Sequence, residues 1–352
     1  DILIMAYTTI NKSSDFFNTK LYTGNATDNH AITGVGFQPD WTWIKNRQTT
    51  NDNVLYDAVR TAGKELESNT TDAERTATDV LKSFNSDGFT LGTSGRVNAS
   101  NTYASWNWKA GTGQGSSNTD GSINTTYTSV NTTSGFSIIK YTGNGTTNAT
   151  IGHGLGVAPK ILIGKCTGTA SNWQVVGNFG SLTEGKYLIL NEPNAIGTSS
   201  NVSFDASATT VKFQGGQGLN ISGQPHIAYC FAEKTGYSKF GSYTGNGNAD
   251  GTFVYTGFKP AFYMIKRTDT TGSWIIKGTK RPGYNVNGTY LVADTNIAEA
   301  TGSGNVASDE LSNGFKIRGS STAINASGGT YIYMAFAEAP LVGSNNVPCT
   351  AR

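Results

Sequence analysis

Two tryptophan pairs are the side chains of this sequence best suited to hold a ligand. Trp41 and Trp43 stand in "DWTWIK", and Trp106 and Trp108 stand in "TYASWNWKAG". In an extended strand, residues i and i+2 share one face, so each pair would form an aromatic platform of the kind that carbohydrate sites use. The first chemistry that these residues suggest is therefore sugar stacking.

Lysines recur at one place in the sequence, at Lys45, Lys165 and Lys266. Their ammonium groups suggest a site for an acidic ligand. Lysines at strand ends more often protect an exposed sheet edge, and this structural interpretation is favoured.

Carboxylates do not form a catalytic pattern. Glu233 and Glu338, in "FAEK" and "FAEA", recur, and Lys109 takes their place in the first copy. A glycosidase requires two carboxyl groups about 5 to 10 Å apart, and nothing in the spacing brings a second one near. We therefore expect no enzyme activity and no catalytic residue.

Metal and cofactor motifs are also weak. The stretch "NGNADG" at residues 246–251 begins like a calcium loop, but Gly257 replaces the glutamate of position 12. A turn is the favoured interpretation. The histidines are too scattered for a zinc or Ser/His/Asp site: His30, His153 and His226. We expect no metal and no cofactor.

Internal repeats organise the chain. "YTGN" begins at Tyr22, Tyr141 and Tyr243, and a proline follows 17 or 18 residues later. The repeated lysine comes six residues after each proline. Eight residues beyond the lysine, the second and third copies have Trp173 and Trp274, whereas the first has Asn53. Asn and Gly tolerate positive φ, so "YTGN" is predicted to be a turn that ends the opening strand of each copy.

The repeats change the interpretation of the tryptophans. The positions that match both pairs are large and apolar in the other copies: Ile161, Ile163, Phe262 and Met264 for the first pair, and Tyr229, Phe231, Met334 and Phe336 for the second. Exposed tryptophans that stack on sugars would not be expected to have large apolar residues at the same position of every copy. We therefore predict that these residues build buried cores.

The fold class follows from composition and spacing. Short β-type runs alternate with Gly, Asn, Asp or Pro every 8 to 12 residues, as in a sandwich. We predict an all-β chain of three tandem β-sandwich repeats, jelly-roll or lectin-like, at residues 1–114, 115–235 and 236–352. A short helix is possible at residues 71–84. The polar stretch 111–121 predicts a flexible link, with the first repeat attached more loosely than the other two.

Composition excludes several classes of function. Charged residues make up 14% of the chain, and 26 basic against 24 acidic residues leave no block of one sign. Neither nucleic-acid binding nor membrane insertion is expected. The chain has three cysteines, Cys166, Cys230 and Cys349. They are expected to be buried thiols, although Cys166 and Cys230 could form a disulfide. Met5 resembles an initiator and no export signal is seen, so release by lysis, as a virus particle, is the expectation.

Several phrases of the chain resemble a family of repeat-containing virion proteins of marine tailed bacteriophages. They include "LYTGN", "GVGFQPDWTWIKNR", "YSKFGSYTGNGNADGTFVYTGFKPAFYMIKRTD" and "GGTYIYMAFAEAPLVG". The resemblance implies a non-enzymatic, tail-fibre-like structural protein, made in the bacterial cytoplasm and carried on the virion. Its implied partners are other virion proteins, copies of itself as a homotrimer, and a host surface glycan.

Host contact is expected in the loops where the copies differ most, at residues 48–53, 192–201 and 280–288. The contact residues themselves are unknown at this stage. Two alternatives remain open: a carbohydrate-binding, lectin-like protein, and a capsid decoration or head-fibre protein.

Overall fold

The computed structural model describes residues 8–200, 202, 204–213, 218–302 and 304–340. Strands make up 43% of the structure and helices 4%, and the strands form several separate antiparallel sheets. The prediction of an all-β fold is confirmed. Cys349 lies outside the described residues.

Three large sheets share a central strand order, to which the second sheet adds the edge strand β10. The first is β1 (Phe17–Thr23), β9 (Thr102–Trp108), β3 (Trp41–Asn46), β4 (Val54–Asp57), β5 (Lys64–Glu67) and β6 (Arg75–Thr76). The second is β10 (Tyr127–Asn131), β11 (Phe136–Thr142), β19 (Pro225–Phe231), β13 (Ile161–Cys166), β14 (Gln174–Gly177), β15 (Lys186–Ile189) and β16 (Gly197–Thr198). The third is β20 (Ser238–Thr244), β27 (Thr330–Pro340), β22 (Phe258–Arg267), β23 (Ile275–Lys277) and β24 (Leu291–Val292).

A small sheet covers one face of each large sheet. The small sheets are β2 (His30–Thr33), β8 (Gly88–Leu91) and β7 (Leu81–Asn85); β12 (Ala149–Gly152), β18 (Thr210–Phe213) and β17 (Asp205–Ala206); and β21 (Phe253–Tyr255), β26 (Gly314–Ile317) and β25 (Ser308–Leu311). Each combination encloses its own apolar core. We name them the first (β1–β9), second (β10–β19) and third (β20–β27) sheet pairs.

The predicted helix at residues 71–84 is wrong. This stretch contains β6 and the start of β7, because Glu65 pairs with Arg75 in the large sheet and the adjacent Val80 and Leu81 both enter the core of the first sheet pair. The short helices of the described chain lie elsewhere, as α1 (Gly95–Asn98) and α2 (Thr322–Asn325), with 3-10 turns η1 (Ser13–Asp15) and η2 (Gly304–Val306).

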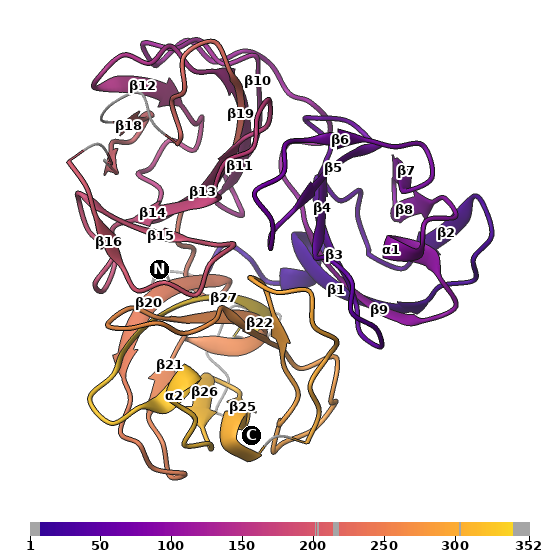
Figure 1. The fold of residues 1–352 in the computed structure, drawn as a ribbon, viewed down its shortest axis with the longest axis vertical. Coiled ribbons are helices and arrows are strands. Elements are labelled where there is room, and N and C mark those ends of the chain that lie inside the picture. Colours follow the sequence, from indigo (N-terminus) through magenta and orange to yellow (C-terminus); the bar gives the residue numbers. More distant parts are fainter. Residues whose placement is uncertain (1–7, 201, 203, 214–217, 303, 341–352) are drawn as a thin grey trace, which may run out of the picture.

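The other faces of the three large sheets meet in one central core. Figure 1 shows the sheet pairs as three lobes around a common centre. All the residues of the repeated apolar positions belong to this core: Trp41, Trp43, Trp106, Trp108, Ile161, Ile163, Tyr229, Phe231, Phe262, Met264, Met334 and Phe336. Strands such as β3 and β13 are buried along their whole length, because both faces of these sheets are covered.

Aromatic contacts in the central core cross from pair to pair. Trp41 stacks on Tyr229, with ring centroids 4.4 Å apart. Phe336 lies 5.5 Å from both Trp108 and Phe231, so one ring of the third sheet pair touches the other two. The predicted burial of the tryptophans is confirmed, and the first sheet pair is as deeply engaged as its neighbours.

The stretch 111–121 is held rather than loose where it leaves the first sheet pair. The Asp40 carboxylate accepts hydrogen bonds from the backbone N–H groups of Ala110, Thr112 and Gly113 at 2.7 to 3.0 Å. The expectation of a more loosely attached first repeat is therefore wrong.

"YTGN" ends β1, β11 and β20, which pair with β9, β19 and β27. The prediction that it ends the opening strand holds in the first and third sheet pairs, whereas β10 precedes β11 in the second. Each tyrosine hydroxyl donates to a carbonyl of the loop before the closing strand, at Val97, Leu219 and Ile324. Close packing, rather than positive φ, requires the glycine: a Cβ on Gly24, Gly143 or Gly245 would lie 2.0 to 2.4 Å from a backbone carbonyl oxygen.

We expect Gly245→Ala to lower the free energy of unfolding by more than about 2 kcal/mol, because the backbone that a Cβ meets here cannot move aside cheaply. Gly304→Ala is the matched control, since nothing lies within 4 Å of the Cβ position there. Urea denaturation measures both variants. Equal stability of the two would contradict the close-packing role of the "YTGN" glycine.

Candidate functional site

The repeated lysines are buried at the junctions between sheet pairs. Lys45, Lys165 and Lys266 are each 0% exposed. Each ammonium group donates to a backbone carbonyl of a neighbouring sheet pair at 2.9 to 3.0 Å: Lys45 to Asn296, Lys165 to Thr71 and Lys266 to Pro193. The first pair thus contacts the third, the second contacts the first, and the third contacts the second, which closes a ring.

A second hydrogen bond repeats at each junction, and it explains why one copy has Asn53 in place of tryptophan. The indole N–H of Trp173 donates to the Glu67 carbonyl at 2.7 Å, and that of Trp274 donates to the Ile189 carbonyl at 2.9 Å. At the third junction, the Asn53 amide donates to the Val292 carbonyl at 3.1 Å. Tryptophan and asparagine therefore both donate a hydrogen bond to the carbonyl at the end of the neighbouring strand.

Backbone bonds complete each junction. The carbonyl oxygen that accepts from each lysine also accepts from a backbone N–H, at Asn51, Ser171 and Gly272, with distances of 2.8 to 2.9 Å. At the junction of the first and third pairs, the Glu299 carboxylate also binds Arg47 and Arg281 at 2.7 Å. The lysines neither protect an edge nor face an acidic ligand, so both sequence interpretations of them are wrong.

Two of the loops proposed for host contact take part in these junctions. Asn51 and Asn53 of the loop 48–53 contact the third sheet pair, and Pro193 and Ile196 of the loop 192–201 accept or donate backbone bonds to it. The loop 280–288 is more open, with Tyr284 78% exposed.

Carboxylates that sequence reasoning missed converge in the first sheet pair. Arg96 contacts Glu65, Glu67 and Asp52, and Arg75 binds Glu65 at 2.5 Å. Burial raises the pKa of Glu67. Every carboxylate of this cluster has an arginine partner, so the cluster forms an ion network rather than an open acid–base pair.

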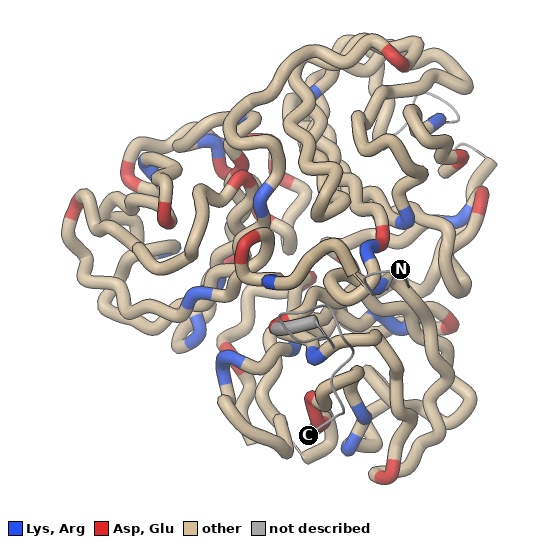
Figure 2. Tube along the Cα trace, turned by 180° about the vertical axis from the view of Figure 1, so that it is seen from behind, with Lys and Arg blue, Asp and Glu red and all other residues tan. Residues whose placement is uncertain are grey.

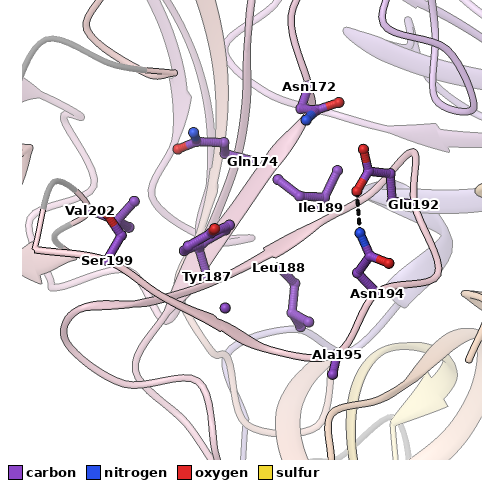
Figure 3. A pocket seen from close by; sticks show the side chains of 11 residues that line it. Asn172, Gln174, Tyr187, Leu188, Ile189, Glu192, Asn194, Ala195, Ser199 and Val202 are labelled. Atoms are coloured by element: carbon purple, nitrogen blue, oxygen red, sulfur yellow. Dashed lines mark hydrogen bonds between the residues drawn. The ribbon is translucent and has the colours of Figure 1, made fainter. Parts of the chain in front are cut away.

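A cleft of about 450 Å³ lies in the second sheet pair. Figure 3 shows the Gln174, Tyr187 and Ile189 side chains, which come from β14 and β15, and the Glu192 and Asn194 side chains, which come from the following loop. The Asn194 amide donates to the Glu192 carboxylate. No lysine or arginine is among the described residues that line the cleft.

Sequence reasoning missed this cleft, although a signal was present. The position of Gln174 corresponds to Val54 and Ile275 in the other copies, and both of these are buried in apolar cores. A glutamine among β-branched residues is the departure that marks the cleft.

The remaining candidates have structural partners. In the loop 246–251, the Asn246 and Asn248 side-chain oxygens accept backbone N–H groups of the same loop, which forms a turn. Within the described residues, no group of three His, Cys, Asp or Glu side chains is arranged to hold a metal ion. Cys166 and Cys230 are buried free thiols, since they are four residues out of register on neighbouring strands.

Charge is spread evenly over the molecule. Figure 2 shows acidic and basic residues interspersed in all three lobes. In the part of the chain that the structure describes, no helix is long and apolar enough to span a bilayer.

A family model matches residues 12–340, which include all six sheets. The chain belongs to this family, described as Domain of unknown function (DUF7483). The DUF7483 match treats the three sheet pairs as one stretch, in keeping with the ring that they form. Neither the curated proteins nor the solved structures include a match to the chain.

We expect the free energy of unfolding to rise with pH above about pH 8. Burial lowers the pKa of Lys45, Lys165 and Lys266 to about 8, whereas an unfolded lysine titrates near about 10.4. The unfolded chain therefore binds more protons in this window, and each lysine adds up to about 1.4 kcal/mol per pH unit. Burial raises the pKa of the Cys230 thiol and of Tyr141, so these groups oppose the rise above about pH 8.5 and pH 10 respectively.

Lys165→Met removes one of these titrations and should reduce the slope by up to about 1.4 kcal/mol per pH unit. Lys12→Met, at a side chain that is 70% exposed, should keep the wild-type slope. Urea denaturation at several pH values between about 7 and 10 measures both. An unchanged slope in Lys165→Met would contradict the buried, partly neutralised lysine.

Proposed function

We propose that the protein is a non-enzymatic structural component of a bacteriophage particle, tail-fibre or tail-associated, which contributes to assembly and host-surface contact. The family resemblance of the sequence motivates the virion assignment. A homotrimer, other virion proteins and a host surface glycan are the partners that we propose with it.

One observation carries the structural part of the proposal. The repeated side chains that suggested chemistry are used to hold three sheet pairs together. The tryptophans lie in the central core, and the lysines donate to carbonyls of neighbouring sheet pairs. A closed β-ring of this kind suits a particle component, because it presents outer loops on a stable frame.

A second candidate function is carbohydrate binding, in which the protein acts as a lectin-like module. The specific observation that favours it is the cleft beside Gln174, which is lined by amides, one carboxylate and a tyrosine. The two functions are compatible, because a surface-contact protein requires a binding site.

Gold-labelled antibodies raised against the purified chain test the particle assignment. We expect them to label intact particles of the phage that encodes the chain, at the tail or its fibres, in negative-stain electron microscopy. Labelling confined to the head would favour the decoration alternative. Particles that carry no label, and from which mass spectrometry recovers no peptide of the chain, would contradict the proposal.

A further inference from the structure

The cleft of the second sheet pair is a departure from its two sibling copies. Gln174 pairs with Ile189 across β14 and β15, and Tyr187 lies on the same face two residues before Ile189. At the position of Gln174, the first and third sheet pairs bury Val54 and Ile275 at 0% and 3% exposure. The second sheet pair thus puts an amide where the fold elsewhere puts apolar core.

A glycine lies against the Gln174 amide. Gly218 stands where the first sheet pair has Arg96, which there reaches Glu67 and Glu65. A Cβ on Gly218 would lie 1.8 Å from the Gln174 amide nitrogen. Gln174 can occupy its position because Gly218 has no side chain there. Among the described residues that line the cleft, none is an arginine like those of the ion network in the first sheet pair.

One polar group of the cleft, the Asn172 side chain, is held by a chain of hydrogen bonds. The backbone N–H of Trp173 donates to the Asn191 side-chain oxygen at 2.8 Å, and the Asn191 amide donates to the Asn172 oxygen at 2.8 Å. This chain of bonds leaves the Asn172 amide N–H groups as donors at the cleft. Trp173 also donates its indole N–H to Glu67 of the first sheet pair, so this chain of bonds begins at a junction residue.

A flat aromatic surface accompanies these groups. The Tyr187 ring lies against Gly197 of β16, where a Cβ would stand 2.5 Å from its Cζ atom. Figure 3 shows the Gln174 and Tyr187 side chains on one side of the cleft and the hydrogen-bonded Glu192 and Asn194 on the other. The aliphatic Leu188, Ile189 and Ala195 complete the lining.

We propose that this cleft binds a neutral saccharide, such as a terminal sugar of a host surface polysaccharide. Sugars present hydroxyl groups that both donate and accept, which amides and a carboxylate match, and C–H faces that pack on an aromatic ring. The volume of about 450 Å³ lies within the usual range of small-molecule sites. Glu192, with no basic residue among the described residues of the lining, selects against anionic sugars.

This inference deepens the proposed host-contact role and rests on it for its biological meaning. Its test uses the purified full chain without particles, so it fails or succeeds independently of the labelling of virions.

Saturation-transfer NMR with defined sugars tests the cleft. The probes are the neutral disaccharides maltose, lactose and N,N′-diacetylchitobiose, with N-acetylneuraminic acid as the anionic comparison. We expect saturation transfer to at least one neutral disaccharide and none to the anionic sugar. Absence of transfer to all three disaccharides, or equal binding of the anionic sugar, would overturn the proposal.

Gln174→Ile is the decisive variant, because the third sheet pair already carries isoleucine at this position in a folded core. We expect it to keep the wild-type melting temperature and to weaken disaccharide binding at least about tenfold, as loss of a hydrogen-bonding side chain requires. Asn194→Ile, which copies Ile297 of the third sheet pair, should also weaken binding. Thr33→Ile, at an exposed threonine of β2 in the first sheet pair and outside the loops proposed for host contact, is the matched control and should bind as the wild type does. Unchanged binding by Gln174→Ile would place the sugar elsewhere and overturn the assignment.

Discussion

The burial of three sheet faces against one another is the constraint on which the rest of this structure depends. Each large sheet has a small sheet on one face and would expose a stripe of tryptophan, phenylalanine, tyrosine or methionine on the other if it stood alone. A buried aromatic side chain of this size contributes about 2 to 3 kcal/mol relative to its exposure. The sheet pairs therefore stabilise one another, and the junction loops are fixed as a consequence.

Apolar packing alone would not determine how the sheet pairs are oriented relative to one another, and the hydrogen bonds of the junctions select one orientation. At each junction the indole or asparagine binds the last carbonyl of a neighbouring strand, and the lysine and a backbone N–H bind a carbonyl of the loop that follows it. Packing dominates where the two requirements conflict: the indole nitrogens of Trp41, Trp43 and Trp108 are buried without a hydrogen-bond partner in the described structure. Each such loss costs about 1 to 3 kcal/mol, which the aromatic contacts must exceed. A further contact joins the first and second sheet pairs. Asp57 forms a buried ion pair with Arg60, and its carboxylate also accepts a hydrogen bond from the Tyr229 hydroxyl at 2.7 Å.

Much of the fold could be predicted from the sequence, because strand alternation, turn residues and internal repeats are local signals. The apolar positions that match Trp41 and Trp106 were correctly assigned to a core, but their placement between sheet pairs was not foreseen, since a strand buried on both faces carries no alternation to reveal its second partner. The lysines were misinterpreted for the same reason: a side chain that binds a carbonyl far away in sequence leaves no local pattern. The prediction of a helix at residues 71–84 is wrong because the alanines and the valine of so short a stretch fit a helical period of 3.6 residues and a strand period of two equally well. The cleft beside Gln174 could have been found by comparing the copies, yet the Gln174 amide lies against Gly218, and no sequence rule places these two residues side by side.

Differential scanning calorimetry of the full chain shows whether the three sheet pairs unfold as one cooperative body. We expect a single transition whose calorimetric and van't Hoff enthalpies agree, since no sheet pair can unfold without exposing the central core. Two or three resolved transitions, or an early transition assigned to the first sheet pair, would contradict it.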